Sequence, residues 1–394
     1  MKADIQFNTS SESLNLPFGW RWVKLGEVCN IVSGTTPKSG ISTFWNGEIV
    51  WVTPTDLGKL VSSYIYDSER KISETGFSSC NLTLLPVGSI VLSSRAPIGY
   101  LAITSIPLCT NQGCKSFIAG STVDTNFLFY TLKLSVKQLQ NIGSGATFAE
   151  ISKTQLENFI IPLPSLPEQK RIAAILNEQM VAVDKARTAA EAQLEAAIKL
   201  QYAYVQETLK LPLKSYSVSE CFTEVSTGVG STWSEYPVLG ATRSGLAPAK
   251  DPVGSRPGRY KLADVGTIFY NPMRILIGSI ALVDDSDIAG ITSPDYVVLK
   301  AKEGILHYRW FYHWLRSSHG EHFIKSLARG AVRERILFNR LIQGSIDLPS
   351  YESQLIAAEK IAKIKPLITG IEEQLKYVNA LPSIILRKAF SGGF

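Results

Sequence analysis

The chain has 394 residues, of which 45% are hydrophobic and 19% charged, the composition of an ordinary globular protein with room for two or three domains. No charged start leads into an apolar run, and no apolar segment reaches roughly 18 residues, so we expect a protein that is neither secreted nor membrane-spanning and that works in the cytoplasm. The formal net charge of +6 permits nucleic-acid binding through local patches but does not by itself argue for it.

The five cysteines form no Cys-x-x-Cys pair, which favours reduced thiols over a disulfide framework or a zinc site. The sequence has no phosphate-binding Gly-x-x-x-x-Gly-Lys-Ser/Thr loop and no Gly-x-Gly-x-x-Gly after a strand. Pro294-Asp295 is followed by Lys300-Ala301-Lys302, without the acid-x-Lys that a metal-dependent nuclease needs there, and Thr35 has no acid or histidine beside it to act as a base. We therefore expect a chain that binds and does not catalyse.

Residues 1–164 are expected to form a first α/β domain, with strand patterns at 49–52 and 89–92 and a helix near 126–140. Three of its loops mix basic and amide side chains with small residues, an inventory that suits a reader of base edges in the major groove. Solvated surface loops have the same composition, and Asp56 is equally well placed to cap a helix. The candidate DNA-binding residues are Thr53, Thr55, Asp56, Arg95, Asn111, Gln112 and Lys115.

Residues 165–210 are predicted to form one long helix, because no glycine or proline occurs from Glu168 to Lys210. Pro167 suits the first turn, and the charges of Glu168 and Lys210 match the helix dipole at the two ends. About 43 residues at 1.5 Å each would span about 65 Å. An apolar stripe at three- and four-residue spacing predicts a second helix along it. The stripe consists of Ala173, Leu176, Met180, Val183, Ala190, Leu194, Ala197 and Tyr204.

Residues 211–349 are expected to form a second α/β domain, with strands at 267–270 and 295–299 and a helix near 308–325. Asn271-Pro272-Met273-Arg274 lacks the second proline and the aromatic residue of the amino-methyltransferase motif, so we interpret it as a turn. The histidines between 307 and 322 are either a metal cluster or a polar helix face. The candidate DNA-binding residues are Arg243, Arg256, Arg259, Arg274 and Arg333.

Residues 350–394 are predicted to form a second long helix, kinked at Pro366 and Pro382. The natural partner of this helix is the first one, in antiparallel orientation; the alternative is that each helix caps its own domain. The seam expected on it consists of Ile356, Ile361, Ile364, Leu367, Ile371, Leu375, Val378 and Leu381.

The two halves of the chain repeat one another in an ordered series of matches. Segment 88–102 is echoed by 266–281, Gly145-Ala146 by Gly330-Ala331, 161–165 by 346–350, and Gln169 by Gln354. The fold class that follows is α+β, with two α/β domains separated by a pair of long antiparallel helices and related by a pseudo-twofold axis. Such symmetry suits a reader of two sites on one long ligand.

Several motifs resemble the DNA-specificity subunits of type I restriction-modification systems. Those motifs lie at 16–27, 51–57, 94–99, 110–113, 161–172 and 385–390. The second domain departs from the family pattern, because its opening at 213–218 lacks the tryptophan-containing start and segment 256–259 replaces the Thr-Asn-Gln loop.

The resemblance implies two target-recognition domains that each read half of a split DNA sequence, with the helices as the ruler between them. It further implies that the helices dock two modification subunits, which bind S-adenosylmethionine and methylate adenine, and that ATP- and Mg-dependent restriction subunits join them. This chain itself would bind no cofactor. The residues expected to dock these partners are Glu168, Gln169, Arg171 and Gln354.

Three functions remain open from the sequence. The first is a non-catalytic DNA reader that places partner enzymes on a bipartite site. The second is a pseudo-symmetric scaffold that docks proteins without binding DNA. The third is a free-standing DNA enzyme with unfamiliar motifs.

Overall fold

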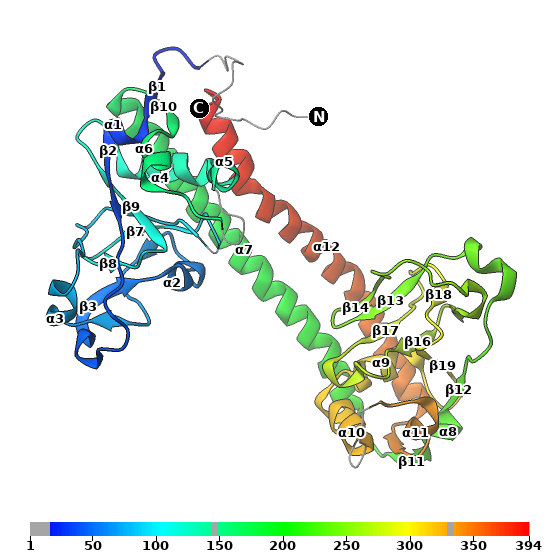
Figure 1. Ribbon diagram of the computed structural model, residues 1–394. Helices are drawn as coiled ribbons and strands as arrows, with labels where there is room; N and C mark the ends of the chain where they lie inside the picture. The colour runs from blue at the N-terminus through cyan, green and yellow to red at the C-terminus, as the bar shows by residue number, and fades with distance from the viewer. Residues whose placement is uncertain (1–15, 96, 144–148, 329–334, 394) are drawn as a thin grey trace. The chain divides into compact units, whose positions relative to one another are not determined.

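The computed structural model describes residues 16–95, 97–143, 149–328 and 335–393 (Figure 1). The chain forms two compact units: unit 1 comprises Met1–Arg187 and Tyr377–Phe394, and unit 2 comprises Thr188–Lys376. The boundary between the units therefore falls inside both long helices, α7 (Leu166–Thr208) and α12 (Tyr351–Phe390). None of the described helices is long and apolar enough to cross a bilayer.

Unit 1 contains a five-stranded sheet of order β2-β9-β6-β7-β4 and a three-stranded sheet of order β5-β3-β8. The central strand β6 (Ile90–Ser93) is buried along its whole length, which explains its continuous apolar sequence. Strands β1 (Arg21–Lys24) and β10 (Ile160–Leu163) form a separate antiparallel pair, and β10 directly precedes α7 in the sequence. The remaining strands are β2 (Cys29–Ser33), β3 (Trp45–Val52), β4 (Tyr64–Ile65), β5 (Lys71–Ile72), β7 (Leu101–Thr104), β8 (Cys109–Thr110) and β9 (Cys114–Ala119).

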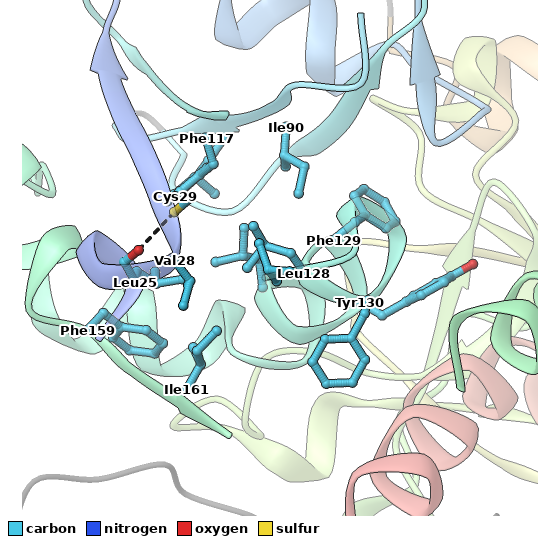
Figure 2. Packing of buried hydrophobic residues seen from close by; sticks show 14 of the residues in the cluster. Leu25, Val28, Cys29, Ile90, Phe117, Leu128, Phe129, Tyr130, Phe159 and Ile161 are labelled. Carbon is cyan, nitrogen blue, oxygen red and sulfur yellow. Dashed lines mark hydrogen bonds between the residues drawn. The ribbon is translucent and has the colours of Figure 1, made fainter. Parts of the chain in front are cut away.

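Helix α4 (Thr125–Leu134) fills the core of unit 1, and Asp124 caps it by accepting a hydrogen bond from Phe127 N at 2.9 Å. Figure 2 shows Leu128 and Phe129 of α4 among Phe117 and Ile90 of the sheet. Both long helices contribute to this core, α7 through Leu176 among others and α12 through Leu386 and Phe390. The shorter helices are α1 (Leu25–Val28), η1 (Ser42–Phe44), α2 (Pro54–Gly58), α3 (Glu74–Ser78), α5 (Val136–Ile142) and α6 (Lys153–Glu157).

Unit 2 contains a four-stranded sheet of order β12-β19-β16-β17, covered by α9 (Tyr308–Leu315). Its core includes Trp310 and Phe311 of α9, Val205 of α7 and Ile361 of α12. The strands are β11 (Lys214–Ser217), β12 (Phe222–Glu224), β13 (Leu239–Thr242), β14 (Gly245–Pro248), β15 (Lys261–Ala263), β16 (Thr267–Tyr270), β17 (Ile280–Leu282), β18 (Gly290–Thr292), β19 (Val297–Ala301) and β20 (Ser345–Leu348). The other helices are α8 (Val218–Cys221), η2 (Gly230–Glu235), η3 (Pro257–Arg259), η4 (Ile275–Ile277), α10 (Ser318–Ala328) and α11 (Phe338–Leu341).

The sequence repeat is matched by a repeat of structure inside the two units. The pair β11 and β20 occupies in unit 2 the place that β1 and β10 occupy in unit 1, directly before a long helix. The central strands β6 and β16 each pair antiparallel with two neighbours. The segments 145–146 and 330–331, which also match in sequence, lie outside the described residues.

The long helices pair through a stripe with seven-residue spacing, as in a coiled coil. On α7 the buried residues are Leu176, Val183, Ala190 and Ala197, as predicted; on α12 they include Ile364, Ile371 and Val378. The start of α7 shares a core with the end of α12 in unit 1, and the reverse holds in unit 2, so the helices run in opposite directions. Helix α12 continues through Pro366 and Pro382.

Part of the seam expected on α12 is wrong. Ile356 is 51% exposed, Leu367 57% and Leu381 38%. Leu367 and Leu381 follow Ile364 and Val378 by three residues, and Ile356 precedes the buried Ala357, so these side chains flank the buried stripe and remain partly accessible. Apolar spacing alone could not distinguish the centre of the stripe from its edge, because both carry large aliphatic residues.

Candidate nucleic-acid interface

The turn between β8 and β9 is the centre of a loop cluster in unit 1. Asn111 N donates to Val52 O at 2.9 Å, and its side-chain Oδ1 accepts from Gly113 N at 2.9 Å. A Cβ atom on Gly113 would lie 3.0 Å from Pro54 Cγ and 3.2 Å from Arg95 Nε. Because Gly113 has no side chain, the segments that carry Pro54 and Arg95 can both pack against the turn at 111–113.

Thr53 and Asp56 form the N-terminal cap of α2. Asp56 Oδ2 accepts from Thr53 N at 2.8 Å and from Thr53 Oγ1 at 2.6 Å, while Oδ1 accepts from Glu69 N at 3.0 Å. With its carboxylate hydrogen-bonded in this way and only 9% of its surface exposed, Asp56 acts as the helix cap that the sequence offered as an alternative. Thr55, between the two, is exposed.

Arg95, Lys115 and Glu150 form an ionic cluster beside the turn. Glu150 Oε2 lies 3.9 Å from Arg95 Nη1, and Glu150 Oε1 lies 3.4 Å from Lys115 Nζ. Lys115 was expected in a loop, but it lies on β9 with a side chain only 8% exposed, because the strand begins at Cys114. The Arg95 side chain is 36% exposed.

Residues 34–36 pack against the tip of this turn. Gly34 lies so close to the turn that a Cβ atom there would meet Asn111 O at 2.0 Å. Thr36 Oγ1 donates to Gln112 Oε1, and the Gln112 side chain remains exposed. All seven sequence-predicted residues of unit 1 thus come together around one turn. Thr36 and Glu150 were missed, because a lone threonine or acid carries no motif.

A cavity of about 650 Å³ lies in unit 2, and Arg243 and Arg274 contribute to its lining together with Lys250 and Asn271. All three basic residues are exposed. Within the described parts of the chain, neither arginine's guanidinium nor the Lys250 ammonium makes an ion pair. Asp251 and Asp295 also line the cavity, so three basic side chains stand against two acidic ones and the lining keeps a small positive excess, which favours an anionic ligand.

The Asn271 segment is the turn that we predicted. Arg274 N donates to Asn271 O at 2.9 Å, and Asn271 Oδ1 accepts from Met273 N at 3.0 Å. The turn leads into η4 and places Arg274 at the cavity.

The expected equivalence between segment 256–259 and the Thr-Asn-Gln loop is wrong. The counterpart of 110–113 is 292–295, where Ser293 Oγ accepts from Asp295 N at 3.4 Å and Tyr296 N donates to Ser293 O at 3.0 Å. Both turns directly precede a strand that pairs with the central one, whereas 256–259 precedes β15. Arg256 and Arg259 are exposed, and neither is among the residues that line the cavity, although the next residue, Tyr260, is. Arg333 lies outside the described residues.

The histidines of unit 2 lie apart from this cavity. His313 is buried against Tyr202, and desolvation lowers its pKa from 6.5 to about 3. His322 Nδ1 lies 2.6 Å from Ser318 O and His319 Nδ1 lies 3.1 Å from Gln206 Nε2, so these rings bond to different partners. Across residues 16–95, 97–143, 149–328 and 335–393, no three His, Cys, Asp or Glu side chains are grouped to hold a metal ion.

The cysteines are free, and four of the five are buried. Burial raises the pKa of Cys29, Cys109 and Cys114 to about 12, so these thiols are poor nucleophiles at neutral pH. The chain thus brings basic and amide side chains to loops, with inert thiols inside.

Residues 17–200 match the family model of the type I restriction modification DNA specificity domain. The chain resembles this specificity domain over somewhat less than half of its length. It is 38% identical over 164 residues to the Type I restriction enzyme MjaIX specificity subunit of Methanocaldococcus jannaschii, which covers 41% of this chain and 38% of the relative. It is 27% identical over 195 residues to the EcoR124I/EcoR124II specificity subunit of Escherichia coli, covering 48% and 47%. The chain thus spans less than half the length of these curated relatives.

The fold of the whole chain is also that of a known type I component. A chain from a solved structure on the assembly and conformational transition of the type I R-M system superposes with a TM-score of 0.65, covering 97% of this chain and 100% of that one. At 20% identity this likeness shows the fold alone. It extends beyond residue 200, where the family model stops, to unit 2.

Within this type I fold, Gln169 and Gln354 have an internal structural role. Gln169 Oε1 accepts from Asp124 N at 2.8 Å, and Nε2 donates to Thr122 O and Pro164 O. Gln354 repeats this pattern with His307 N, Ile305 O and Pro349 O. Both side chains are fully buried, so they join a long helix to its own unit and offer no surface to a partner.

Glu168 and Arg171 remain on the surface at the start of α7. Arg171 Nη2 lies 2.7 Å from Glu168 Oε1, and this hydrogen bond lowers the pKa of the Glu168 carboxyl. Of the four residues expected to dock partners, these two are therefore accessible.

Proposed function

We propose that this chain is the DNA sequence-specificity subunit of a type I restriction-modification complex and that it reads a bipartite target. The observation that supports this most directly is the duplication: each unit joins a long helix through the same buried glutamine and presents basic side chains from the loops around its central strand. Because the two units carry different side chains on these loops, they would recognise two different half-sites.

The proposed reading residues of unit 1 are those that the loop cluster leaves accessible. Arg95 can pair with guanine, while Asn111 and Gln112 can pair with adenine. Thr55 is exposed as well. Thr53 is half-buried and Asp56 and Lys115 are buried, so these three residues would stabilise the loops without contacting DNA. In unit 2 we propose Arg243 and Arg274 as the primary contacts, with Arg256, Arg259 and Arg333 as more peripheral ones.

The proposed partners are two modification subunits and ATP-dependent restriction subunits in the cytoplasm, bound along the long helices with Glu168 and Arg171 at the contact. S-adenosylmethionine, ATP and Mg would be held by those partners. The specificity chain would bind no cofactor and perform no catalysis, and its contribution would be to place adenine methylation and restriction on one DNA sequence.

The test of this proposal is to map methylated adenines in DNA exposed to the full chain with its modification subunit. We expect methylation at a split site, two short fixed sequences separated by a gap of constant length. Methylation of a continuous site would contradict the two-reader arrangement.

The runner-up is a pseudo-symmetric protein scaffold that never touches DNA, favoured by exposed aliphatic residues such as Leu367 on α12. Salt distinguishes the two functions. Binding to DNA through phosphates weakens steeply with salt, with a log–log slope of about −0.9 per phosphate neutralised, whereas an apolar docking surface is insensitive to it. If a labelled random duplex is not retained by the chain even at low salt, the scaffold is favoured.

A further inference from the structure

We propose that Glu150 is a positioning residue for DNA recognition by unit 1, an inference that rests on the proposed function. Its carboxylate holds Arg95 and Lys115 in place, and its negative charge reduces binding to non-cognate DNA. Glu150 therefore raises the ratio of specific to non-specific binding while making no base contact itself.

The backbone fixes Glu150 beside Arg95. The two residues form an antiparallel β-bridge, and the next residue, Ile151, donates its N–H to Ser94 O at 3.0 Å. The side chains of Arg95 and Glu150 consequently start from neighbouring backbone segments, outside the strands. The Arg95 side chain also lies against Gly113, since a Cβ atom built at position 113 would be only 3.2 Å from Arg95 Nε.

The carboxylate bridges two cations of different accessibility. Its two oxygens lie 3.9 Å from Arg95 Nη1 and 3.4 Å from Lys115 Nζ. Lys115, at 8% side-chain exposure, is a buried ammonium that needs a compensating charge, while Glu150 is 42% exposed and faces solvent. One carboxylate between two cations leaves a net positive site with a fixed geometry.

The equivalent position of unit 2 has the opposite charge. Ile336 N donates to Pro272 O at 3.1 Å, as Ile151 N does to Ser94 O, so Arg335 is the counterpart of Glu150. Arg335 lines a second cavity of about 350 Å³ with Glu224, Lys261 and Asp295. The same backbone position thus carries an acid in one unit and a base in the other, as expected of a position that adapts each unit to its own half-site.

Removing the carboxylate has two effects of opposite sign. Without it, Arg95 gains rotational freedom, so pairing with a guanine edge loses preorganisation. The same change leaves two cations uncompensated, so contact with any phosphate improves. A residue that only stabilised the fold would weaken binding to both kinds of DNA together.

The experiment uses the full chain and a double-stranded oligonucleotide library randomised at every position. Glu150→Gln is compared with the matched control Glu157→Gln, which removes a carboxylate of similar exposure that pairs with Lys153 on α6. We measure retention of the unselected library at low salt, and then the consensus recovered after selection. Glu150→Asp keeps the charge and tests for partial rescue.

We expect Glu150→Gln to retain about threefold more unselected DNA, the factor for one unit charge about 7 Å from a phosphate in water. The consensus should broaden at one half-site and stay unchanged at the other, with Glu157→Gln like wild type. The inference about Glu150 would be overturned if Glu150→Gln left both the retention and the consensus unchanged, or if both Gln variants had equal effects. Neither of these results would contradict the proposed function. If wild type itself selects no consensus, the proposed function fails and this inference fails with it.

Discussion

Arg95 and Lys115 carry the same charge and lie beside the same carboxylate, that of Glu150, but their side chains differ in exposure to solvent. The Arg95 side chain is more than a third exposed, and Lys115 is almost wholly buried on β9. A base contact needs an accessible donor, so at this scale the two residues should respond to substitution in different ways.

Arg95→Ala should weaken DNA binding by roughly 1–3 kcal/mol, the loss expected for a base-reading arginine. Its thermal unfolding should stay close to that of wild type, since its ion pair is partly exposed. Lys115→Ala should instead lower the unfolding temperature, because it leaves Glu150 with one cation and opens a gap beside β9. Fluorescence anisotropy and calorimetry on both variants check this. Equal binding by Arg95→Ala and wild type would remove Arg95 from the interface.

Gln169 is the residue on which the junction of α7 with unit 1 depends. Gln169→Leu would leave Asp124 N, Thr122 O and Pro164 O without a partner, at a cost of about 1–3 kcal/mol for each buried group that stays unsatisfied. We expect urea unfolding to show a loss in this range or above it. The control is Gln193→Leu, at an exposed position on the same helix, which should be near neutral. A neutral Gln169→Leu would refute the role assigned to this amide.

Helix α9 joins the sheet of unit 2 to the long helices. Arg309 Nη2 lies 2.7 Å from Asp285 Oδ2 and also pairs with Asp284, while Lys365 of α12 lies 3.0 Å from Asp287 Oδ2. Burial alone would raise the pKa of Asp284, but the hydrogen bonds and charges of Arg309 and Lys365 outweigh it, and the pKa is lowered. His313 on the same helix is buried and uncharged.

The stability of unit 2 should fall as the pH drops below about 6.5. Because the pKa of His313 is about 3 when folded and 6.5 in the reference state, only the unfolded chain takes up this proton between those values. The pKa of His307 is lowered in the same direction by burial. From pH 7.5 to 5.0 we expect a loss of about 2 kcal/mol from His313, at roughly 1.4 kcal/mol per unit of pH below 6.5.

His313→Gln should remove that share of the pH dependence. Urea unfolding followed by tryptophan fluorescence at pH 7.5 measures the packing lost in the variant, and the difference between pH 7.5 and 5.0 measures the titration. A variant with the full pH dependence of wild type would show that His313 is not the group that titrates.

At the scale of elements, the sequence was most informative where one pattern persisted. The uninterrupted run after Pro167 predicted a helix over 165–210, and α7 spans Leu166–Thr208. The strand patterns at 89–92 and 267–270 correspond to β6 (Ile90–Ser93) and β16 (Thr267–Tyr270), and both were recognisable because these strands are central and buried on both faces. The counterpart of the turn at 110–113 was misplaced because the turns at 110–113 and 292–295 correspond in position and hydrogen bonding but have only one residue type, the first threonine, in common.

The site was predicted only in part, for a related reason. Residue type identified Arg95 and Asn111, but the burial of Lys115, the capping role of Asp56 and the position of Glu150 depend on strands that pair across long sequence separations. No local pattern records such pairing. Gln169 was correctly matched to Gln354 by sequence, and its internal role became evident only from the three groups that it bonds.

For the whole molecule, the long helices are the ruler of the proposed function. Inserting one heptad after Ala190, with a matched heptad after Lys376 in α12, adds about 10 Å of helix and preserves the seven-residue series. We expect the gap between the half-sites to grow by about three base pairs, at 3.4 Å each, with both half-site sequences unchanged. Methylation mapping of the variant complex measures this gap. An unchanged gap would mean that the helices do not set the distance.

The last segment of the chain completes the unit that begins with the first. Phe390 packs against Trp20 and Phe127 at ring-centroid distances of 6.1 and 5.3 Å, and Leu386 and Ala389 belong to the same core. Residues 188–376 form unit 2 without these side chains. A chain truncated before residue 386 would therefore keep the core of unit 2 but leave Trp20 and Phe127 of unit 1 uncovered, and limited proteolysis should cut unit 1 of that variant first.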